Sequence, residues 1–293
     1  MDNTKKPATI AAHAAGAIDL QSGGVVPALQ PSTTYLRSAD YALVRPDNIY
    51  SRADSDNLRQ AEEVLRLLEG AEDTMLFPSG MAAIAAVFRT MPNGGTAILQ
   101  SGIYWGTIAW IREFCARRDI TLVEVDADDL IATCQSQKAD LVFIETPSNP
   151  WLKTMDIRAV ADASDAILVV DGTAATPILT RALDHGADIA MHSATKAING
   201  HSDVLAGVLS TRAKDASIWE MIRADRKMAG AILGPFEAWM LTRAMRTLPL
   251  RVERMSQNAQ MLAEYLLNHD AVQNVFYPGL PSHTGFETAQ KQM

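Results

Sequence analysis

Short apolar runs alternate with stretches of helical composition over the central part of the chain. Apolar runs bounded by turn residues are typical of buried parallel strands. Their alternation with helices indicates an α/β domain with a mainly parallel sheet. The expected strands are TAILQS, ITLVEV, DLVFIE, AILVVD and DIAMHS.

Helical spacing marks other segments. A helix is expected from about residue 57, capped by Ser55 or Asp56. MAAIAAVF, directly after Ser79-Gly80, has the composition of a buried helix, and RVERMSQNAQMLAEYLLNH is expected to form one long helix before the turn-rich YPGLPSHTG. The apolar positions that define the first helix are Leu58, Ala61, Leu65 and Leu68.

Changes of pattern divide the chain into three parts. Residues 1–48 show no sustained periodicity and contain several prolines, so we expect an extended amino-terminal arm. Residues 49–244 carry the α/β pattern, and residues 245–293 begin with the long helix that is expected to lead into a second, smaller domain. A chain of 293 residues with 48% hydrophobic content exceeds the usual size of one compact unit.

Composition excludes several classes of function. The formal net charge of −8 argues against nucleic acid or an anionic membrane surface as a partner. No run approaches the roughly 18 apolar residues that a membrane span needs. The alanine-rich amino terminus, interrupted by His13, does not resemble a signal peptide, so a cytoplasmic protein is expected. Cys115 and Cys134 lie in predicted helices and indicate no disulfide framework.

A lysine stands among small hydroxyl and glycine residues directly after the expected strand DIAM. In HSATKAINGHSD, Lys196 follows Ser193 and Thr195. The two hydroxyl groups offer hydrogen bonds to an anion, and a deprotonated lysine amine condenses with an aldehyde. Pyridoxal 5′-phosphate (PLP) supplies both the anion and the aldehyde. An isolated lysine is usually a solvated surface residue, so the motif requires a second feature.

Asp171, which ends the run AILVVD, is that second feature. PLP acts as an electron sink only while its pyridine nitrogen stays protonated, and a carboxylate beside the nitrogen keeps it so. Ligands of open α/β sheets bind at the carboxyl ends of the strands, and one short crossover separates Asp171 from Lys196. We therefore expect both side chains within reach of one planar ligand. His192 and His201 flank Lys196 outside any common zinc spacing, and no metal site is expected.

Several separated blocks of the sequence match a known pattern. They are YSR at 50–52, FPSGMAAI at 77–84, ETPSNP at 145–150, VVDGTAATP, GADIAMHSATK, RAMRTLPLRVERMSQNAQMLAEYL and YPGLPSH. Over roughly residues 20–293 the chain resembles the Cys/Met-metabolism family of PLP enzymes, which includes cystathionine γ-synthase, γ-lyase and β-lyase and methionine γ-lyase. The resemblance implies the aspartate-aminotransferase-like fold type I of PLP-dependent transferases, with a mainly parallel central sheet and an incomplete carboxyl-terminal α/β domain.

The resemblance implies a role for each matching position near the cofactor ring. Lys196 matches the Schiff-base lysine, and Asp171 matches the partner of the pyridinium nitrogen. Tyr104 matches the tyrosine that stacks on the ring and assists proton movement. Asn149 matches the asparagine that hydrogen-bonds to the ring hydroxyl. Lys196, Tyr104 and Asp171 are the expected catalytic residues.

A second set matches the phosphate site of the family. Ser193, Thr195 and Ser79, with the backbone amides of Gly80 and Met81, are implied to hold the phosphate. This placement is physically sound, because the start of a helix presents free N–H groups and the positive end of its dipole.

Tyr50 and Arg52 match a pair that reaches the phosphate bound in a neighbouring subunit. The resemblance therefore implies a homodimer or homotetramer with shared active sites.

The chain departs from the family at three small residues and at its carboxyl end. Gly172, Ala174 and Ala197 replace larger side chains that are usual in the family, and we expect them to widen the pocket. Family members usually run further and carry an arginine for the substrate carboxylate in the added part. No residue here is assigned that role, so a fragment of a longer protein or a truncated relative is expected.

The function implied by the resemblance is elimination or replacement at the γ (or β) carbon of a sulfur-related amino acid, such as cystathionine or an O-acylhomoserine. Tyr104-Trp105-Gly106-Thr107 resembles the γ-acting members. One alternative is a PLP-binding protein without productive catalysis, acting as a carrier or regulatory subunit. Another is an unrelated nucleotide-binding α/β protein, which the absence of G-x-G-x-x-G and P-loop motifs disfavours.

Overall fold

Segments from distant parts of the sequence assemble into two units in the computed structural model, which describes residues 5–293. The first unit combines the described residues up to Arg89 with Ser193–Pro249, and the second combines Thr90–His192 with Leu250–Met293. The predicted domain boundaries at residues 48 and 244 stay a prediction. Residues 1–4 of the predicted arm lie outside the described residues.

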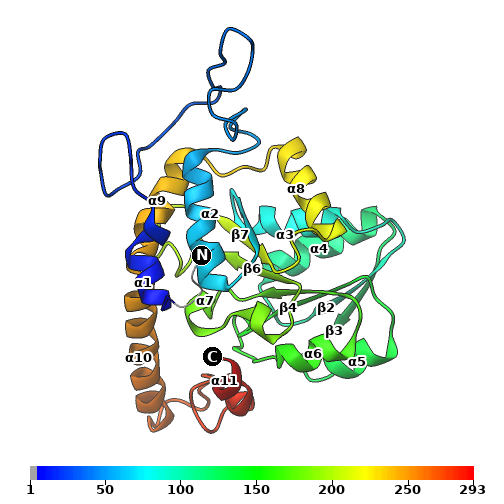
Figure 1. Cartoon of the computed structure of the whole chain (residues 1–293). Helices are drawn as coiled ribbons and strands as arrows, with labels where there is room; N and C mark the ends of the chain where they lie inside the picture. Colours follow the sequence, from blue (N-terminus) through cyan, green and yellow to red (C-terminus); the bar gives the residue numbers. More distant parts are fainter. Residues whose placement is uncertain (1–4) are drawn as a thin grey trace. The chain divides into compact units, whose positions relative to one another are not determined.

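Helix α2 is the central helix of the first unit, where it packs against α1 and α9 (Figure 1). Strands β1 and β7 pair antiparallel, with Asp73 opposite Thr211 and Phe77 opposite Gly207. Helix α3 lies against β7 and α8. The elements of this unit are α1 (Pro7–Ala12), η1 (Ala14–Gly16), α2 (Asp56–Glu69), β1 (Asp73–Phe77), α3 (Gly80–Arg89), β7 (Gly207–Thr211), α8 (Ser217–Ala229) and α9 (Pro235–Met245).

The predicted start and apolar face of α2 are confirmed. Ser55 is the N-cap, and its hydroxyl accepts a hydrogen bond from the Leu58 N–H at 3.4 Å. Gly70 ends the helix with a φ of 65°, a left-handed conformation that favours glycine. The apolar residues that defined the pattern are all buried, and they are Leu58, Ala61, Leu65 and Leu68.

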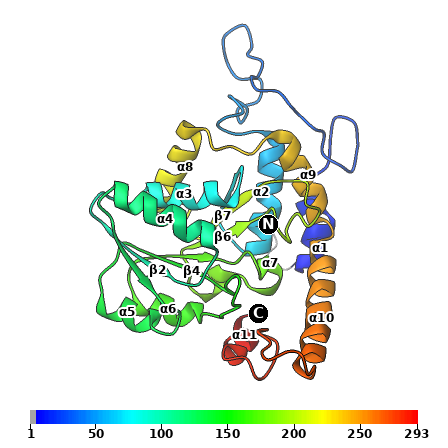
Figure 2. The same cartoon turned by 180° about the vertical axis from the view of Figure 1, so that it is seen from behind.

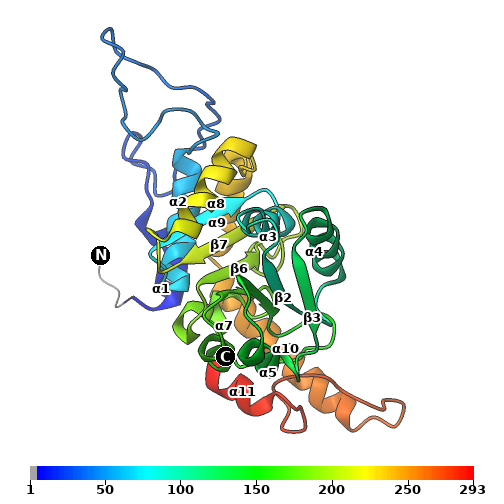
Figure 3. The same ribbon diagram turned by 90° about the vertical axis from the view of Figure 1, so that its right-hand side faces the viewer.

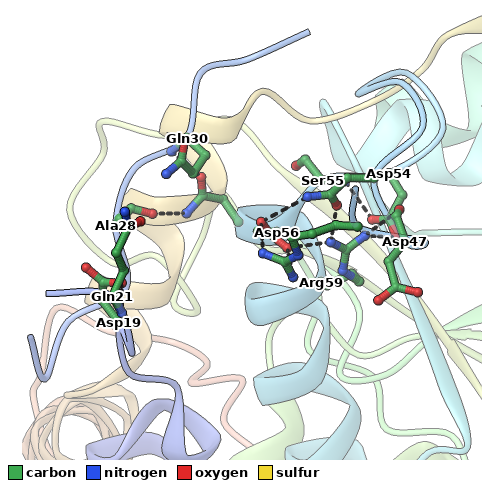
Figure 4. Close-up of polar contacts among 12 residues, drawn as sticks. Asp19, Gln21, Ala28, Gln30, Asp47, Asp54, Ser55, Asp56 and Arg59 are labelled. Atoms are coloured by element: carbon green, nitrogen blue, oxygen red, sulfur yellow. Dashed lines mark hydrogen bonds and ion pairs between the residues drawn. The ribbon is translucent and has the colours of Figure 1, made fainter. Parts of the chain in front are cut away.

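Arg59 on the first turns of α2 organises the junction with the amino-terminal arm (Figure 4). Its guanidinium group donates to the Asp54 and Asp56 carboxylates at 2.5 Å each and to the Asn48 side chain at 2.6 Å. Desolvation opposes the charged form of Arg59, but these carboxylates outweigh it and raise its pKa. The junction is therefore fixed by charge-assisted hydrogen bonds.

Residues 17–54 run as turns, bends and isolated bridges, and Figure 3 shows the long loop between α1 and α2 to which they belong. Asn57 holds this loop by donating to the Ala28 carbonyl and accepting from the Gln30 N–H, both at 2.9 Å. Trp239 on α9 donates to the Pro27 carbonyl at 2.8 Å. The helix α1 and the turn η1 precede the loop, so the arm is extended only in part. Its alanine-rich start buries Ile10 and Ala11.

The second unit contains a parallel sheet in the order β3-β2-β4-β5-β6. Figure 3 shows β2 and β3 side by side, and Figure 2 shows the neighbouring helices α5 and α6. Each predicted parallel strand is confirmed. The elements are β2 (Thr96–Gln100), α4 (Trp105–Arg117), β3 (Thr121–Val125), α5 (Leu130–Ser136), β4 (Leu141–Glu145), α6 (Ile157–Ala163), β5 (Ile167–Asp171), α7 (Thr176–Leu179), η2 (Ala182–His185), β6 (Ile189–Ser193), most of α10 (Leu248–Leu267) and α11 (Phe286–Gln292).

Both cysteines are buried free thiols in helices, Cys115 in α4 and Cys134 in α5. Burial raises the pKa of the Cys115 thiol to about 11 and raises the pKa of the Cys134 thiol as well. Among residues 5–293, no helix has both the length and the apolar character needed to cross a membrane.

Candidate active site

The turn between β1 and α3 contains Ser79 and Gly80, in the first unit. The Ser79 hydroxyl accepts a hydrogen bond from the Ala82 N–H at 3.1 Å, as an N-terminal cap does. Helix α3 begins at Gly80, so the amides of Gly80 and Met81 lie in its first turn, at the positive end of the helix dipole. This arrangement favours an anion at the start of α3.

The backbone of β7 holds this turn at close range. A Cβ atom built on Gly207 would lie 2.1 Å from the Ser79 carbonyl oxygen and 2.9 Å from the Gly80 nitrogen. Only glycine allows this approach. The conformation of the turn is therefore set by Gly207, which lies far from it in the sequence.

Lys196 follows β6 in a turn that is hydrogen-bonded to Ala206, the residue directly before β7. The Thr195 hydroxyl donates to the Ala206 carbonyl at 3.3 Å and accepts from the Ala206 N–H at 3.0 Å. Ser193 is half-buried and Lys196 is exposed. In the first unit, Thr195 therefore contacts Ala206, and Ser79 contacts the next residue, Gly207.

Tyr50 and Arg52 lie at the end of the arm. The Arg52 guanidinium donates to the Lys227 carbonyl of α8 at 2.8 Å and lies 5.5 Å from the centre of the Tyr50 ring. Both side chains are exposed. Their predicted contact with a neighbouring subunit stays a prediction.

Asp171 ends β5 in the second unit, and its side chain is only 6% exposed. Its Oδ1 accepts hydrogen bonds from the Thr173 N–H at 2.9 Å and the Thr173 hydroxyl at 2.5 Å. Burial raises the pKa of Asp171, while Thr173 and the neighbouring His192 oppose that effect. A cation beside this carboxyl group would restore its charged form.

Glu145 ends β4 directly beside Asp171 and was not predicted. The two residues are partners in the parallel register. Glu145 is 4% exposed, and burial together with the Asp171 charge raises its pKa to about 7. Asp171 was predicted as a site residue because it is an acidic residue at the end of the apolar run AILVVD. Glu145 ends the apolar run DLVFIE in the same way.

Tyr104 and Asn149 are linked through Glu145. The Tyr104 N–H donates to Glu145 Oε2 at 3.0 Å, and the Asn149 N–H donates to Glu145 Oε1 at 2.6 Å. Tyr104 precedes α4 and packs against Trp105 with ring centres 5.7 Å apart. The second unit therefore groups Tyr104, Asn149 and Asp171 around one buried carboxyl group.

Gly172 lies against the His192 ring. A Cβ atom at this position would lie 2.9 Å from Cε1 of the His192 ring. The imidazole therefore occupies the space into which a longer side chain would extend. The expectation of a wider pocket stays a prediction.

Comparison with known proteins connects this geometry to a family. The model of the Cys/Met metabolism PLP-dependent enzymes matches residues 8–293. The chain belongs to this family. It is 38% identical over 288 residues to a cystathionine beta-lyase of Lactococcus lactis, covering 96% of this chain and 74% of the relative. A cystathionine gamma-lyase of Dictyostelium discoideum is 35% identical over 296 residues, covering 99% of this chain and 76% of the relative.

A solved structure of the same family has the same fold. The cystathionine gamma synthase from Xanthomonas oryzae pv. oryzae, in complex with aminoacrylate and cysteine, superimposes with a TM-score of 0.93 at 32% identity. The match covers 98% of this chain and 75% of that one. The predicted fold of a PLP-dependent transferase, the cofactor PLP and the trans-sulfuration class of enzyme are confirmed. A PLP carrier without catalysis and an unrelated nucleotide-binding protein are not favoured.

The residues of this family member fit the cofactor at two independent places. The turn of Ser79, held by Gly207, suits a phosphate, and the buried carboxyl group of Asp171 suits a protonated ring nitrogen. PLP carries an anionic phosphate and a ring nitrogen that must stay protonated.

Replacing Gly207 by alanine is expected to weaken PLP binding at least about tenfold, because the new methyl group displaces the Ser79 turn. Titrating the apo protein with PLP measures this affinity. The matched control is Ser210→Ala, on the same strand, which removes a buried hydroxyl contact of 2.7 Å with Thr74. We expect this control to lower the free energy of unfolding by about 1 kcal/mol and to leave PLP affinity unchanged. Wild-type affinity in the Gly207 variant would contradict the assignment.

Proposed function

We propose that this enzyme catalyses elimination or replacement at the γ carbon of an amino acid such as cystathionine or an O-acylhomoserine. The observation that carries the PLP chemistry of this proposal is the buried carboxyl group of Asp171 at the end of β5, in a chain whose family uses PLP. Tyr104-Trp105-Gly106-Thr107 supports γ-chemistry by its resemblance to γ-acting members.

Lys196 and Asp171 perform the central steps in this proposal. Bound PLP supplies an electron sink that stabilises negative charge at the substrate Cα. The Lys196 amine would hold the cofactor through an imine and would move the proton at the substrate Cα. The exposed position of Lys196 in its turn leaves the amine free to change partners. Asp171 keeps the proton on the ring nitrogen.

The other predicted residues bind and orient. Ser79, Ser193 and Thr195 are proposed to hold the phosphate, with the amides of Gly80 and Met81 at the start of α3. In this structure the Thr195 hydroxyl donates to the Ala206 carbonyl, so its contribution to phosphate binding requires a change of partner.

Tyr104 is proposed to cover the cofactor ring, and Asn149 is proposed to bind the ring hydroxyl. The loops of both residues are held by the carboxyl group of Glu145, which supports a fixed position for their side chains.

We also propose that the enzyme works as a homodimer or homotetramer. The arm exposes large apolar side chains, with Leu20 85%, Leu36 76% and Tyr41 80% exposed. Apolar side chains grouped on one segment support burial against a partner. In that assembly, Tyr50 and Arg52 would reach the cofactor phosphate of the neighbouring subunit.

The second candidate is β-elimination, which is supported by the similarity to the cystathionine beta-lyase of Lactococcus lactis. Assaying the purified protein with cystathionine, methionine, O-succinylhomoserine and O-acetylhomoserine separates the candidates. We expect 2-oxobutyrate, or a thioether when a thiol acceptor is present. Pyruvate from cystathionine would overturn γ-chemistry in favour of the second candidate.

A further inference from the structure

We propose that Glu145 is a positioning residue of the cofactor site, which ties the loops of Tyr104 and Asn149 to the strand end beside Asp171. The inference rests on the proposed function, because it takes Tyr104, Asn149 and Asp171 as contacts of PLP. It gives a role to Glu145, which begins the matched block ETPSNP but received no role from the sequence pattern or the family resemblance.

The geometry is that of a bridge between two loops. Oε2 of Glu145 accepts from the Tyr104 N–H at 3.0 Å, and Oε1 accepts from the Asn149 N–H at 2.6 Å. The Glu145 N–H itself donates to Oε1 of Gln100, at the end of β2, at 3.0 Å. One residue therefore connects the ends of β2 and β4 with the loops that follow them.

The bridge uses both oxygens of a carboxyl group. Tyr104 stands at the start of α4 and Asn149 stands in the loop after β4, so no continuous element of secondary structure joins them. Hydrogen bonds from backbone N–H groups to a carboxylate are among the strong ones in proteins. A side chain with a single acceptor oxygen cannot replace both contacts.

Glu145 also lies within the electrostatic field of Asp171. The two residues are register partners on β4 and β5, and His192 on β6 is the further titratable neighbour of Asp171. Burial and the Asp171 charge raise the pKa of Glu145 to about 7. A neutral Glu145 removes a repulsion from Asp171, so its protonation state affects how readily Asp171 holds its charge beside the ring nitrogen.

The first test is Glu145→Gln in the full chain, prepared without cofactor and titrated with PLP. Glutamine keeps the volume but presents one acceptor oxygen, so one of the two N–H contacts is lost. We expect PLP affinity to fall about tenfold and kcat for the γ-substrate to fall by a similar factor, with KM changing less than about twofold. The pH dependence of PLP affinity near neutrality is expected to become flatter.

Glu145→Asp is the second variant. Its carboxylate reaches only one of the two N–H groups, but the titrating group is retained. We therefore expect an intermediate PLP affinity with a pH profile close to that of the wild type.

Glu62→Gln is the matched control, because Glu62 is an acid whose side chain is only 15% exposed and whose pKa burial raises to about 7. It accepts from the Leu76 N–H and from Arg226, at 2.9 Å each, in the first unit. This control is expected to lower the unfolding temperature and to leave PLP affinity and its pH profile unchanged.

Three experimental outcomes would contradict the positioning role of Glu145 or the proposed function on which it rests. Wild-type PLP affinity and pH profile in both Glu145 variants would overturn the positioning role, even if their stability fell. An equal loss of PLP affinity in Glu62→Gln would also overturn it, because the effect would then follow general destabilisation. Failure of the wild type to carry a pyridoxyl group on Lys196 after borohydride reduction would sink the proposed function itself, which mass mapping reports separately.

Discussion

Replacing Lys196 by alanine is expected to abolish covalent attachment of PLP and to lower kcat/KM by at least about 10,000-fold. The loss is large because one amine both holds the cofactor and moves the proton at the substrate Cα. Borohydride reduction followed by peptide mass mapping measures the attachment, and keto-acid release measures the activity.

Lys138→Ala is the matched control, since Lys138 is an exposed lysine on the loop after α5. We expect this variant to keep wild-type attachment and activity within about twofold. A yellow, fully active Lys196 variant would refute the assignment of the lysine.

Asp171→Asn is expected to lower kcat by about 1,000-fold while PLP remains attached to Lys196. Asparagine keeps the shape of the side chain and an acceptor for Thr173, but it carries no negative charge. The ring nitrogen then loses the group that keeps it protonated. Absorption spectra and steady-state kinetics over a range of pH measure the two effects separately.

Asp165→Asn provides the control for Asp171, because Asp165 is an exposed acid just before the opposite end of β5. Its replacement is expected to leave kcat within about twofold of the wild type. A reduction of less than about tenfold in Asp171→Asn would show that the carboxylate is not the partner of the ring nitrogen.

The sequence predicted the parallel strands well because each is a buried apolar run between turn residues. The antiparallel pair of β1 and β7 escaped prediction for physical reasons. DTMLF begins with a charged residue that three residues separate from the end of α2, and GVLST is rich in small residues. Their pairing joins residues that are far apart in the chain, and local pattern carries no information about such contacts.

Part of the candidate site could also be predicted from local sequence features. Asp171 was found because it closes an apolar run, and Lys196 was found because of the hydroxyl residues beside it. Glu145 was missed although it closes an apolar run as Asp171 does, and Gly207 was missed because its importance depends on a neighbour brought by the fold. Gly207 is an ordinary strand glycine until the Ser79 carbonyl is placed against it. Arg52 depends on a partner subunit, so its role stays a prediction.

The buried state of Cys115 and Cys134 has a consequence for an enzyme proposed to release sulfur compounds. A thiol whose pKa is about 11 carries almost no thiolate at neutral pH, and the thiolate is the form that reacts. Because burial raises the pKa of both thiols, disulfides formed from released thiol products are expected to exchange slowly with this enzyme. Alkylating reagents are expected to spare the folded protein for the same reason.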